Sequence, residues 1–133
     1  VLPLAGLHLL LAEDNELNSE IATALLEEQG ASITAVENGR LALEAIQNAA
    51  PRTYDAILMD VMMPEMNGLE ATRCIRAFEG KGPGEGTPII AMTANVFADD
   101  VKACLDAGMN SHVGKPLDMK VLIGEILKYA DAR

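Results

Sequence analysis

The chain of 133 residues has few aromatic side chains: no tryptophan, two tyrosines and two phenylalanines. A buried core must therefore rest on aliphatic residues and on the seven methionines. The apolar runs, such as Leu9–Ala12 and Ala56–Met59, are far shorter than the ~20 residues that span a bilayer. No basic segment precedes an apolar stretch at Val1, so we do not expect a signal peptide.

Basic residues and cysteines are also scarce. Ten Lys and Arg stand against 20 Asp and Glu, which gives a formal net charge of −10. Such a surface repels phosphate backbones, so we expect no direct binding to nucleic acid. The two cysteines, Cys74 and Cys104, form no C-x-x-C motif. We expect free thiols in a reducing cytosol, with a structural disulfide as the poorer alternative.

Hydrophobic residues make up 50% of the chain and charged residues 23%, a composition typical of a folded protein. The length fits one domain, residues 1–133, with a core over about 7–130. Short apolar runs alternate five times with longer helical patterns. We predict buried strands in these runs, at residues 7–12, 31–36, 55–60, 88–92 and 111–113.

The helical segments between these runs carry apolar stripes at helical spacing, which we expect to face the core. Gly30 is expected to close the first helix as a left-handed cap, and Pro51 to stop the second. Asp118 is expected to cap the last helix. The stripes of the first, third and fourth helices are Leu17, Ile21, Ala22, Leu25 and Leu26; Ala71, Ile75 and Phe78; and Phe97, Val101, Cys104 and Leu105.

Five alternating β and α units with continuous apolar strands predict an α/β fold, a parallel sheet covered by helices on both faces. Five units are too few for an eight-stranded barrel. We therefore predict an open, doubly wound, flavodoxin-like (βα)5 sheet with the strand order 2-1-3-4-5. The glycine-rich stretch Gly80–Gly86 contains no G-K-[ST] motif and is expected to be a mobile surface connector.

Polar residues follow four of the predicted strands, and open α/β sheets bind ligands at the carboxyl ends of their strands. Glu13 and Asp14 follow the first strand, Asp60 ends the third, Thr93 follows the fourth and Lys115 comes shortly after the fifth. Three carboxylates and one ammonium sum to −2, which one Mg²⁺ would neutralise. Mg²⁺ prefers oxygen ligands and often binds phosphate as well, an arrangement suited to phosphoryl transfer to a carboxylate. On spacing alone, a metal-assisted phosphate site and ordinary strand-end polarity both remain open.

Four separate segments resemble the receiver domain of two-component response regulators. They are Leu11–Asn15, Leu58–Gly68, Ala91–Ala94 and Gly114–Pro116, and they occur in the family's order along nearly the whole chain. The stretches 13–18 and 108–112 are most similar to receivers fused to hybrid sensor histidine kinases.

The resemblance implies a phosphoryl-accepting signalling switch in a phosphorelay. Asp60 would accept a phosphoryl group from a phosphohistidine, and Thr93 and Lys115 would contact that group. Mg²⁺ would be held by Glu13, Asp14, Asp60 and the backbone carbonyl of Met62. Pro116 would follow a cis peptide bond. The expected chemistry is self-phosphorylation and slow dephosphorylation without metabolic turnover.

One position departs from the family pattern. The family often has Tyr or Phe three residues before the lysine, where this chain has His112. We expect His112 and Thr93 to form the conformational switch, the alternative being a half-exposed histidine with no coupling. Phosphorylation would then alter the surface formed by the last two helices and the strand at 111–113.

The implied partners are a histidine kinase or a histidine phosphotransfer domain, and a weak homodimer through that same surface is a further expectation. We expect no direct membrane insertion and a cytoplasmic location, either free or tethered to the inner membrane through a longer parent protein. Such a parent would be a candidate histidine kinase.

Three other functions are alternatives that these residues fit less well. An FMN-binding flavodoxin relative needs a phosphate loop rich in Ser, Thr and Gly, but acidic residues follow the first strand here. An aspartyl-phosphate phosphatase of the haloacid dehalogenase type would have a second Asp where Met62 stands. A phosphorylation-independent interaction module would usually have lost an acidic residue or Lys115, and none is lost.

Overall fold

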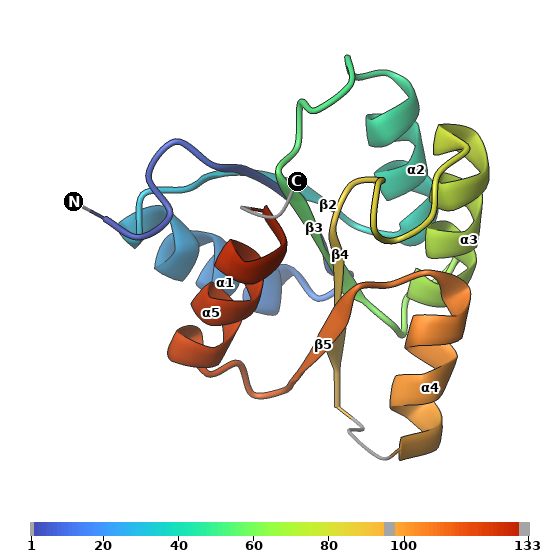
Figure 1. Ribbon diagram of the computed structural model, residues 1–133. Coiled ribbons are helices and arrows are strands. Elements are labelled where there is room, and N and C mark those ends of the chain that lie inside the picture. The colour runs from blue at the N-terminus through green and yellow to red at the C-terminus, as the bar shows by residue number, and fades with distance from the viewer. Residues whose placement is uncertain (1, 95–97, 131–133) are drawn as a thin grey trace.

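The computed structural model describes residues 2–94 and 98–130. Strands and helices alternate throughout this part of the chain (Figure 1). The elements are β1 (His8–Ala12), α1 (Glu16–Glu28), β2 (Ser32–Val36), α2 (Gly39–Gln47), β3 (Ala56–Asp60), α3 (Gly68–Glu79), β4 (Ile89–Thr93), α4 (Ala98–Ala107), β5 (Ser111–Gly114) and α5 (Met119–Ala130).

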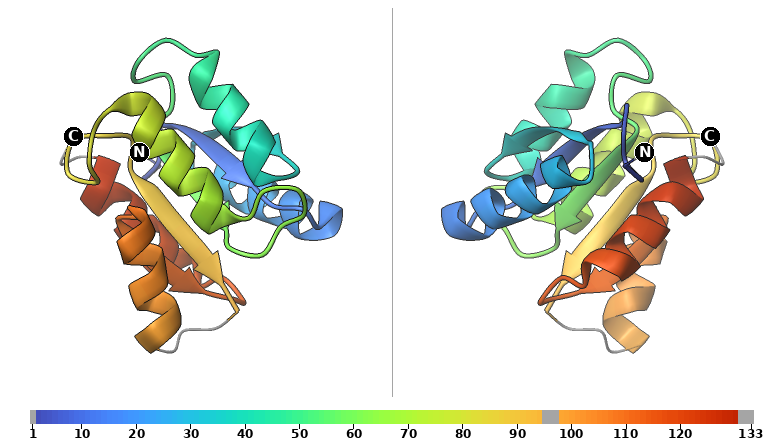
Figure 2. Two further views of the ribbon diagram at one scale, coloured as in Figure 1. Left: turned by 90° about the vertical axis from the view of Figure 1, so that its right-hand side faces the viewer. Right: turned by 90° about the vertical axis from the view of Figure 1, so that its left-hand side faces the viewer.

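The five strands form one parallel sheet in the order β2-β1-β3-β4-β5, which confirms the predicted fold. Helices α1 and α5 cover one face, and α2, α3 and α4 cover the other (Figures 1 and 2). Side chains alternate between the two faces, so neighbouring strand residues enter different cores. Leu9 and Leu11 pack beneath α1 and α5, whereas Leu10 and Ala12 pack beneath the other three helices.

The helix caps follow from the sequence. The side chains of Asn15, Asn38 and Asn67 accept hydrogen bonds from backbone N–H groups in the first turns of α1, α2 and α3. Gly30 follows α1 with a φ of +101°, as predicted for a left-handed residue. Helix α2 ends at Gln47, earlier than the position predicted from the proline that follows.

Three predicted core stripes are partly wrong. On α1 only Ala22 and Leu26 are buried, while Leu17, Ile21 and Leu25 are 64%, 51% and 38% exposed. The helix crosses a sheet face that α5 also occupies, so its contact strip is narrower than its apolar stripe. On the other face, Phe78 of α3 and Leu105 of α4 are also exposed, and Phe97 lies outside the described residues.

The glycine-rich connector is exposed from residue 80 to 85, as expected for a surface segment, and it is held by hydrogen bonds. The backbone N–H groups of Glu85 and Gly86 donate to the carbonyl of Gly82, and the amide of Asn110 donates to the carbonyl of Pro83. Both cysteines are free thiols, with Cys104 buried and Cys74 half-buried. Within residues 2–94 and 98–130, none of the helices is both long and apolar enough to cross a bilayer.

Candidate functional site

The predicted site residues lie together at the carboxyl edge of the sheet. The register pairs Ala12 with Met59, Asp60 with Met92, and Thr93 with Gly114. The residues that follow β1 and β5 are therefore at the same level as the ends of β3 and β4. Parallel pairing alone produces this convergence, because it aligns like ends of strands that are distant in sequence.

Three carboxylates form a cluster at this edge. One oxygen from each of Glu13, Asp14 and Asp60 lies within 4.8 Å of the others. Glu13 and Asp60 are buried, whereas Asp14 is exposed. Glu13 is fixed through its backbone N–H, which donates to the carbonyl of Val36, and its carboxylate accepts from the N–H of Asn15. The acidic side chains thus converge from the ends of two adjacent central strands.

Lys115 lies within this cluster. Its Nζ is 3.0 Å from Oε2 of Glu13, a residue 102 positions away, and 3.1 Å from Oδ2 of Asp60. The backbone N–H of Lys115 donates to the carbonyl of Thr93, which fixes the chain just after β5. The peptide bond between Lys115 and Pro116 is cis, as the resemblance implied. The three carboxylates and this ammonium carry a net charge of −2.

The crowding changes the acidity of Asp60. Burial is the main factor that raises its pKa, to about 6, and the charge of Glu13 acts in the same direction. The hydrogen bond from Lys115 opposes this rise without cancelling it. Burial also works against the ammonium of Lys115, but its bonds to Glu13 and Asp60 outweigh burial, so the pKa of Lys115 is raised. Lys115 therefore remains a cation. A further positive charge nearby would stabilise the ionised form of Asp60.

The carboxylate cluster fits a magnesium ion. Mg²⁺ takes oxygen ligands at about 2.0–2.1 Å in an octahedron, so two of its ligands lie at most roughly 4.2 Å apart. The oxygens of Glu13, Asp14 and Asp60 lie within 4.8 Å of one another, a separation that side-chain movements can close around one ion. The exposure of Asp14 leaves room on that side for the water ligands that Mg²⁺ usually keeps.

Thr93 and His112 are on the same side of the sheet. Thr93 is buried at the end of β4, and His112 is half-buried on β5. His112 pairs with Ala91, and Thr93 pairs with Gly114, two residues further along each strand. Because side chains repeat with a period of two, His112 and Thr93 point to the same face. The register therefore places them one step apart along adjacent strands.

An apolar hollow borders the cluster beside α1. Its volume is about 320 Å³, and both Glu13 and Lys115 are in its wall. Ile21 and Leu25 line it from α1, and Leu117 lines it from the segment after β5. The exposed side of α1 is thus continuous with the edge of the charged site. This surface was not predicted from the sequence. The signal for it was the width of the apolar stripe on α1, which is greater than one buried helix face requires.

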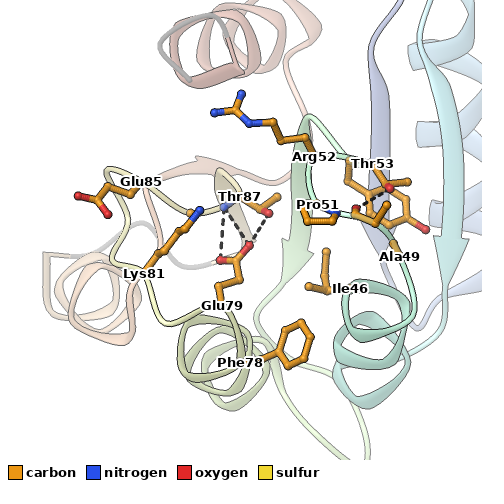
Figure 3. A pocket seen from close by; sticks show the side chains of 13 residues that line it. Ile46, Ala49, Pro51, Arg52, Thr53, Phe78, Glu79, Lys81, Glu85 and Thr87 are labelled. Atoms are coloured by element: carbon orange, nitrogen blue, oxygen red, sulfur yellow. Dashed lines mark hydrogen bonds between the residues drawn. The ribbon is translucent and has the colours of Figure 1, made fainter.

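A second hollow, of about 350 Å³, opens at the opposite edge of the sheet, between the α2–β3 loop and the connector (Figure 3). The carboxylate of Glu79 lies within it and accepts hydrogen bonds from the N–H and Oγ1 of Thr87. Arg76 pairs with Glu79 at 3.1 Å and donates to the carbonyls of Thr87 and Gly108. These polar groups link the connector to α3, and α3 to the turn that follows α4.

Comparison with known proteins extends these findings. Residues 9–127 match the family described as the response regulator receiver domain. A probable histidine kinase 1 of Oryza sativa subsp. indica is 41% identical over 140 residues, which cover 84% of this chain and 14% of that protein. The chain thus spans about a seventh of that relative's length.

Two solved structures are similar. The receiver domain of a sensor histidine kinase from Pseudomonas aeruginosa PAO1 is 38% identical, with a TM-score of 0.82 over 96% of this chain and 99% of that one. That crystal structure has a magnesium ion coordinated in its active site cleft. The receiver domain of the Saccharomyces cerevisiae regulator Ssk1, in a co-crystal with the phosphotransfer protein Ypd1, is 26% identical. Its TM-score is 0.83, over 94% of this chain and 89% of that chain.

Proposed function

The chain belongs to the response regulator receiver domain family, and from this we propose that Asp60 is its phosphoryl acceptor. A receiver domain is a phosphoryl-accepting switch of two-component systems. The observation that carries the assignment is the position of Asp60: it ends the central strand β3, lies 3.1 Å from the ammonium of Lys115 and belongs to the carboxylate cluster.

The geometry supports an in-line transfer to Asp60. A carboxylate oxygen of Asp60 would form a bond to phosphorus as the bond from phosphorus to the imidazole nitrogen of a phosphohistidine breaks. The ring nitrogen keeps the electron pair and takes up a proton. Lys115 would then move from its bridging position between Glu13 and Asp60 to pair with a phosphoryl oxygen. The hydroxyl of Thr93, at the adjacent strand end, would donate to another phosphoryl oxygen.

We propose that Glu13, Asp14, Asp60 and the backbone carbonyl of Met62 hold Mg²⁺. When bound, the ion would offset negative charge on the transferring phosphoryl group. The fit of the three carboxylates supports this set, as does the magnesium ion in the receiver from P. aeruginosa. Met62 lies in the loop directly after β3, two residues beyond Asp60, and is 78% exposed.

The proposed phosphodonor is a histidine kinase or a histidine phosphotransfer domain. We propose that it docks on the exposed face of α1, formed by Leu17, Ile21 and Leu25, next to the apolar hollow. Exposed apolar patches of this kind mark interaction sites. The complex of the yeast receiver with Ypd1 supports the class of partner. The position of this face next to Lys115 would bring the partner's histidine within reach of Asp60.

The output would be a change in the surface formed by α4, β5 and α5. Movement of Thr93 toward the phosphoryl group would free space for His112 to turn inward, and α4, β5 and α5 would present an altered surface. A weak homodimer through these elements is one proposed readout. We further propose that residues 1–133 act as one receiver domain at a cytoplasmic location, either free or tethered through a longer parent protein.

The test is intact mass after incubation with acetyl phosphate. With Mg²⁺, the wild-type chain should gain one phosphoryl group, and a chelator should prevent the gain. Asp60→Asn should abolish it because the amide cannot act as the nucleophile. Asp106→Asn is the matched control, since Asp106 lies exposed on α4 and pairs with Lys102. An undiminished adduct in Asp60→Asn would falsify the assignment.

A further inference from the structure

The loop between β3 and α3, residues 61–67, carries the proposed carbonyl ligand Met62. Its first half is fixed to the sheet, because the N–H of Val61 donates to the carbonyl of Met92 and the carbonyl of Val61 accepts from Gly68. Met62 itself is 78% exposed, so its side chain cannot anchor the loop. Its backbone is held from one side by Val61 and Met63, which pack against the core, and from the other side by the contacts of the second half of the loop.

The start of α2 holds that second half. The N–H of Gly39 donates to the carbonyl of Met66 at 2.9 Å. The Nε of Arg40 donates a hydrogen bond to Oε2 of Glu65 at 3.1 Å, and Nη2 lies 3.0 Å from the same oxygen as an ion pair. Two consecutive residues of α2 therefore bind two consecutive residues of the loop, one through the backbone and one through charge.

The contact at Gly39 allows no side chain. A Cβ on Gly39 would lie 2.3 Å from the carbonyl oxygen of Met66 and 2.9 Å from that of Asn67. Both obstacles are backbone atoms, so they can yield only if the loop itself moves. The absence of a side chain at residue 39 is what lets the loop lie against α2.

Arg40 binds Glu65, the residue at which the loop backbone is strained. Glu65 has a φ of +63°, which is in the left-handed region and costs about 1 kcal/mol or more for a residue with a side chain. Met66 donates to the carbonyl of Pro64 at 2.7 Å, which closes a tight turn around Glu65. Strained backbone of this kind persists only where its surroundings enforce it. The contacts of Met66 with Gly39 and of Glu65 with Arg40 hold the backbone in this conformation.

We infer that Gly39 and Arg40 are positioning residues for the phosphorylation site, holding the loop so that Met62 lies correctly for the metal. This inference rests on the proposed function. It assigns a role in Mg²⁺ affinity to two residues of α2, neither of which belongs to the carboxylate cluster.

The direction in which the Mg²⁺ affinity changes when Arg40 is removed distinguishes a positioning role from a purely electrostatic one. Removing the positive charge of Arg40 should strengthen binding of a cation if only long-range charge mattered. Positioning predicts the opposite: Arg40→Ala should raise the Kd for Mg²⁺ by about twofold to fivefold, as expected for loss of an exposed charge pair. Arg40→Lys should recover part of that loss. Glu44→Ala is the matched control, because it removes only the other ion pair of Arg40.

Gly39→Ala should raise the Kd for Mg²⁺ by about tenfold or more. Gly124→Ala is its control, since Gly124 lies on α5 with open space around it and should leave the Kd unchanged. The measurement is titration of each metal-free protein with MgCl₂ at fixed ionic strength, with melting in EDTA recorded beside it. If Gly39→Ala fails to fold, the Arg40 variants decide alone.

Equal or tighter Mg²⁺ binding by Arg40→Ala, or unchanged binding by a folded Gly39→Ala, would overturn the inference, and phosphorylation of wild-type Asp60 would still support the proposed function. A wild-type chain that binds Mg²⁺ but never gains a phosphoryl group would instead overturn the proposed function. A wild-type chain that does not bind Mg²⁺ would overturn the inference as well.

Discussion

At the scale of single residues, Asp60 combines burial with two charged neighbours of opposite sign. Glu13 and the apolar surroundings disfavour its ionised form, and Lys115 favours it. The balance leaves an acid whose pKa is raised to about 6, close to the pH at which the protein would operate. Any added positive charge stabilises the ionised form of such a carboxyl group. A metal ion and Lys115 can therefore both bind at this site.

The raised pKa of Asp60 predicts a pH-dependent penalty in metal-free protein. Because the folded state binds this proton more tightly than the unfolded state, its contribution to stability is present below about pH 4. It is lost as the pH rises through about 6. Asp60→Asn should therefore be more stable than wild type in EDTA by a margin that grows between pH 4 and 6.5, reaching at most roughly 3 kcal/mol.

Urea unfolding of both proteins across this range, in EDTA, gives the margin directly. Saturating Mg²⁺ should shrink the margin at pH 7, because the ion stabilises the ionised carboxylate that the variant lacks. A margin that stays constant from pH 4 to 7 would contradict the prediction.

At the scale of elements, α1 shows how an apolar stripe can serve two purposes. Ala22 and Leu26 pack into the core, while Leu17, Ile21 and Leu25 remain exposed on the same helix. The exposed set borders the hollow that contains Lys115. The β3–α3 loop is ordered in two ways: Val61, Met63 and Met66 pack against the core, and Glu65 and Met66 contact the start of α2.

The exposed face of α1 predicts a binding defect without a folding defect. Ile21→Ser should weaken binding to a histidine phosphotransfer protein about tenfold or more, since apolar anchors dominate such interfaces. Its free energy of unfolding should change by less than about 0.5 kcal/mol, because Ile21 is 51% exposed.

The assay uses a phosphotransfer protein that passes its phosphoryl group to the wild-type chain, with affinity measured by titration. Val121→Ser is the control, because Val121 is equally exposed, at 52%, on α5. Wild-type affinity in Ile21→Ser, or an equal loss in Val121→Ser, would remove α1 as the docking face.

At the scale of the whole molecule, metal binding and folding are linked. Three carboxylates drawn from β3 and from the segment after β1 repel one another in the folded state and are far apart in the unfolded chain. A ligand that binds only the folded state stabilises it by RT ln(1 + [L]/Kd), which is about 2.7 kcal/mol at a hundredfold excess over Kd. Mg²⁺ should therefore raise the melting temperature of the wild-type protein.

Asp14→Ala should reduce this Mg²⁺-induced rise, because one of the three carboxylates is lost. Without Mg²⁺ the variant should melt at or above the wild-type temperature, since carboxylate crowding is relieved. Melting curves with MgCl₂ and with EDTA test both statements. A Mg²⁺ shift of wild-type size in Asp14→Ala would exclude Asp14 from the metal site.

The sequence by itself determined the elements and the residues of the site. Apolar runs of strand length between helical patterns required a parallel sheet, and strand ends carrying Glu13, Asp14, Asp60, Thr93 and Lys115 indicated the edge that holds the candidate site. These features are local, because the periodicity of side chains and the order of the segments depend only on residues that are consecutive in the chain. The resemblance to a family then attached roles to these positions.

Only the tertiary structure decided which side chains meet. The 3.0 Å contact between Glu13 and Lys115 joins residues 102 positions apart, and the raised pKa of Asp60 depends on it. The exposure of Ile21 depends on how much of α1 the sheet and α5 can cover, and the missing side chain of Gly39 has meaning only beside the carbonyl of Met66. The sequence pattern shows that a helix face is apolar or that a residue has no side chain. Which residues contact that face or that residue is decided by packing between segments that are distant in the sequence.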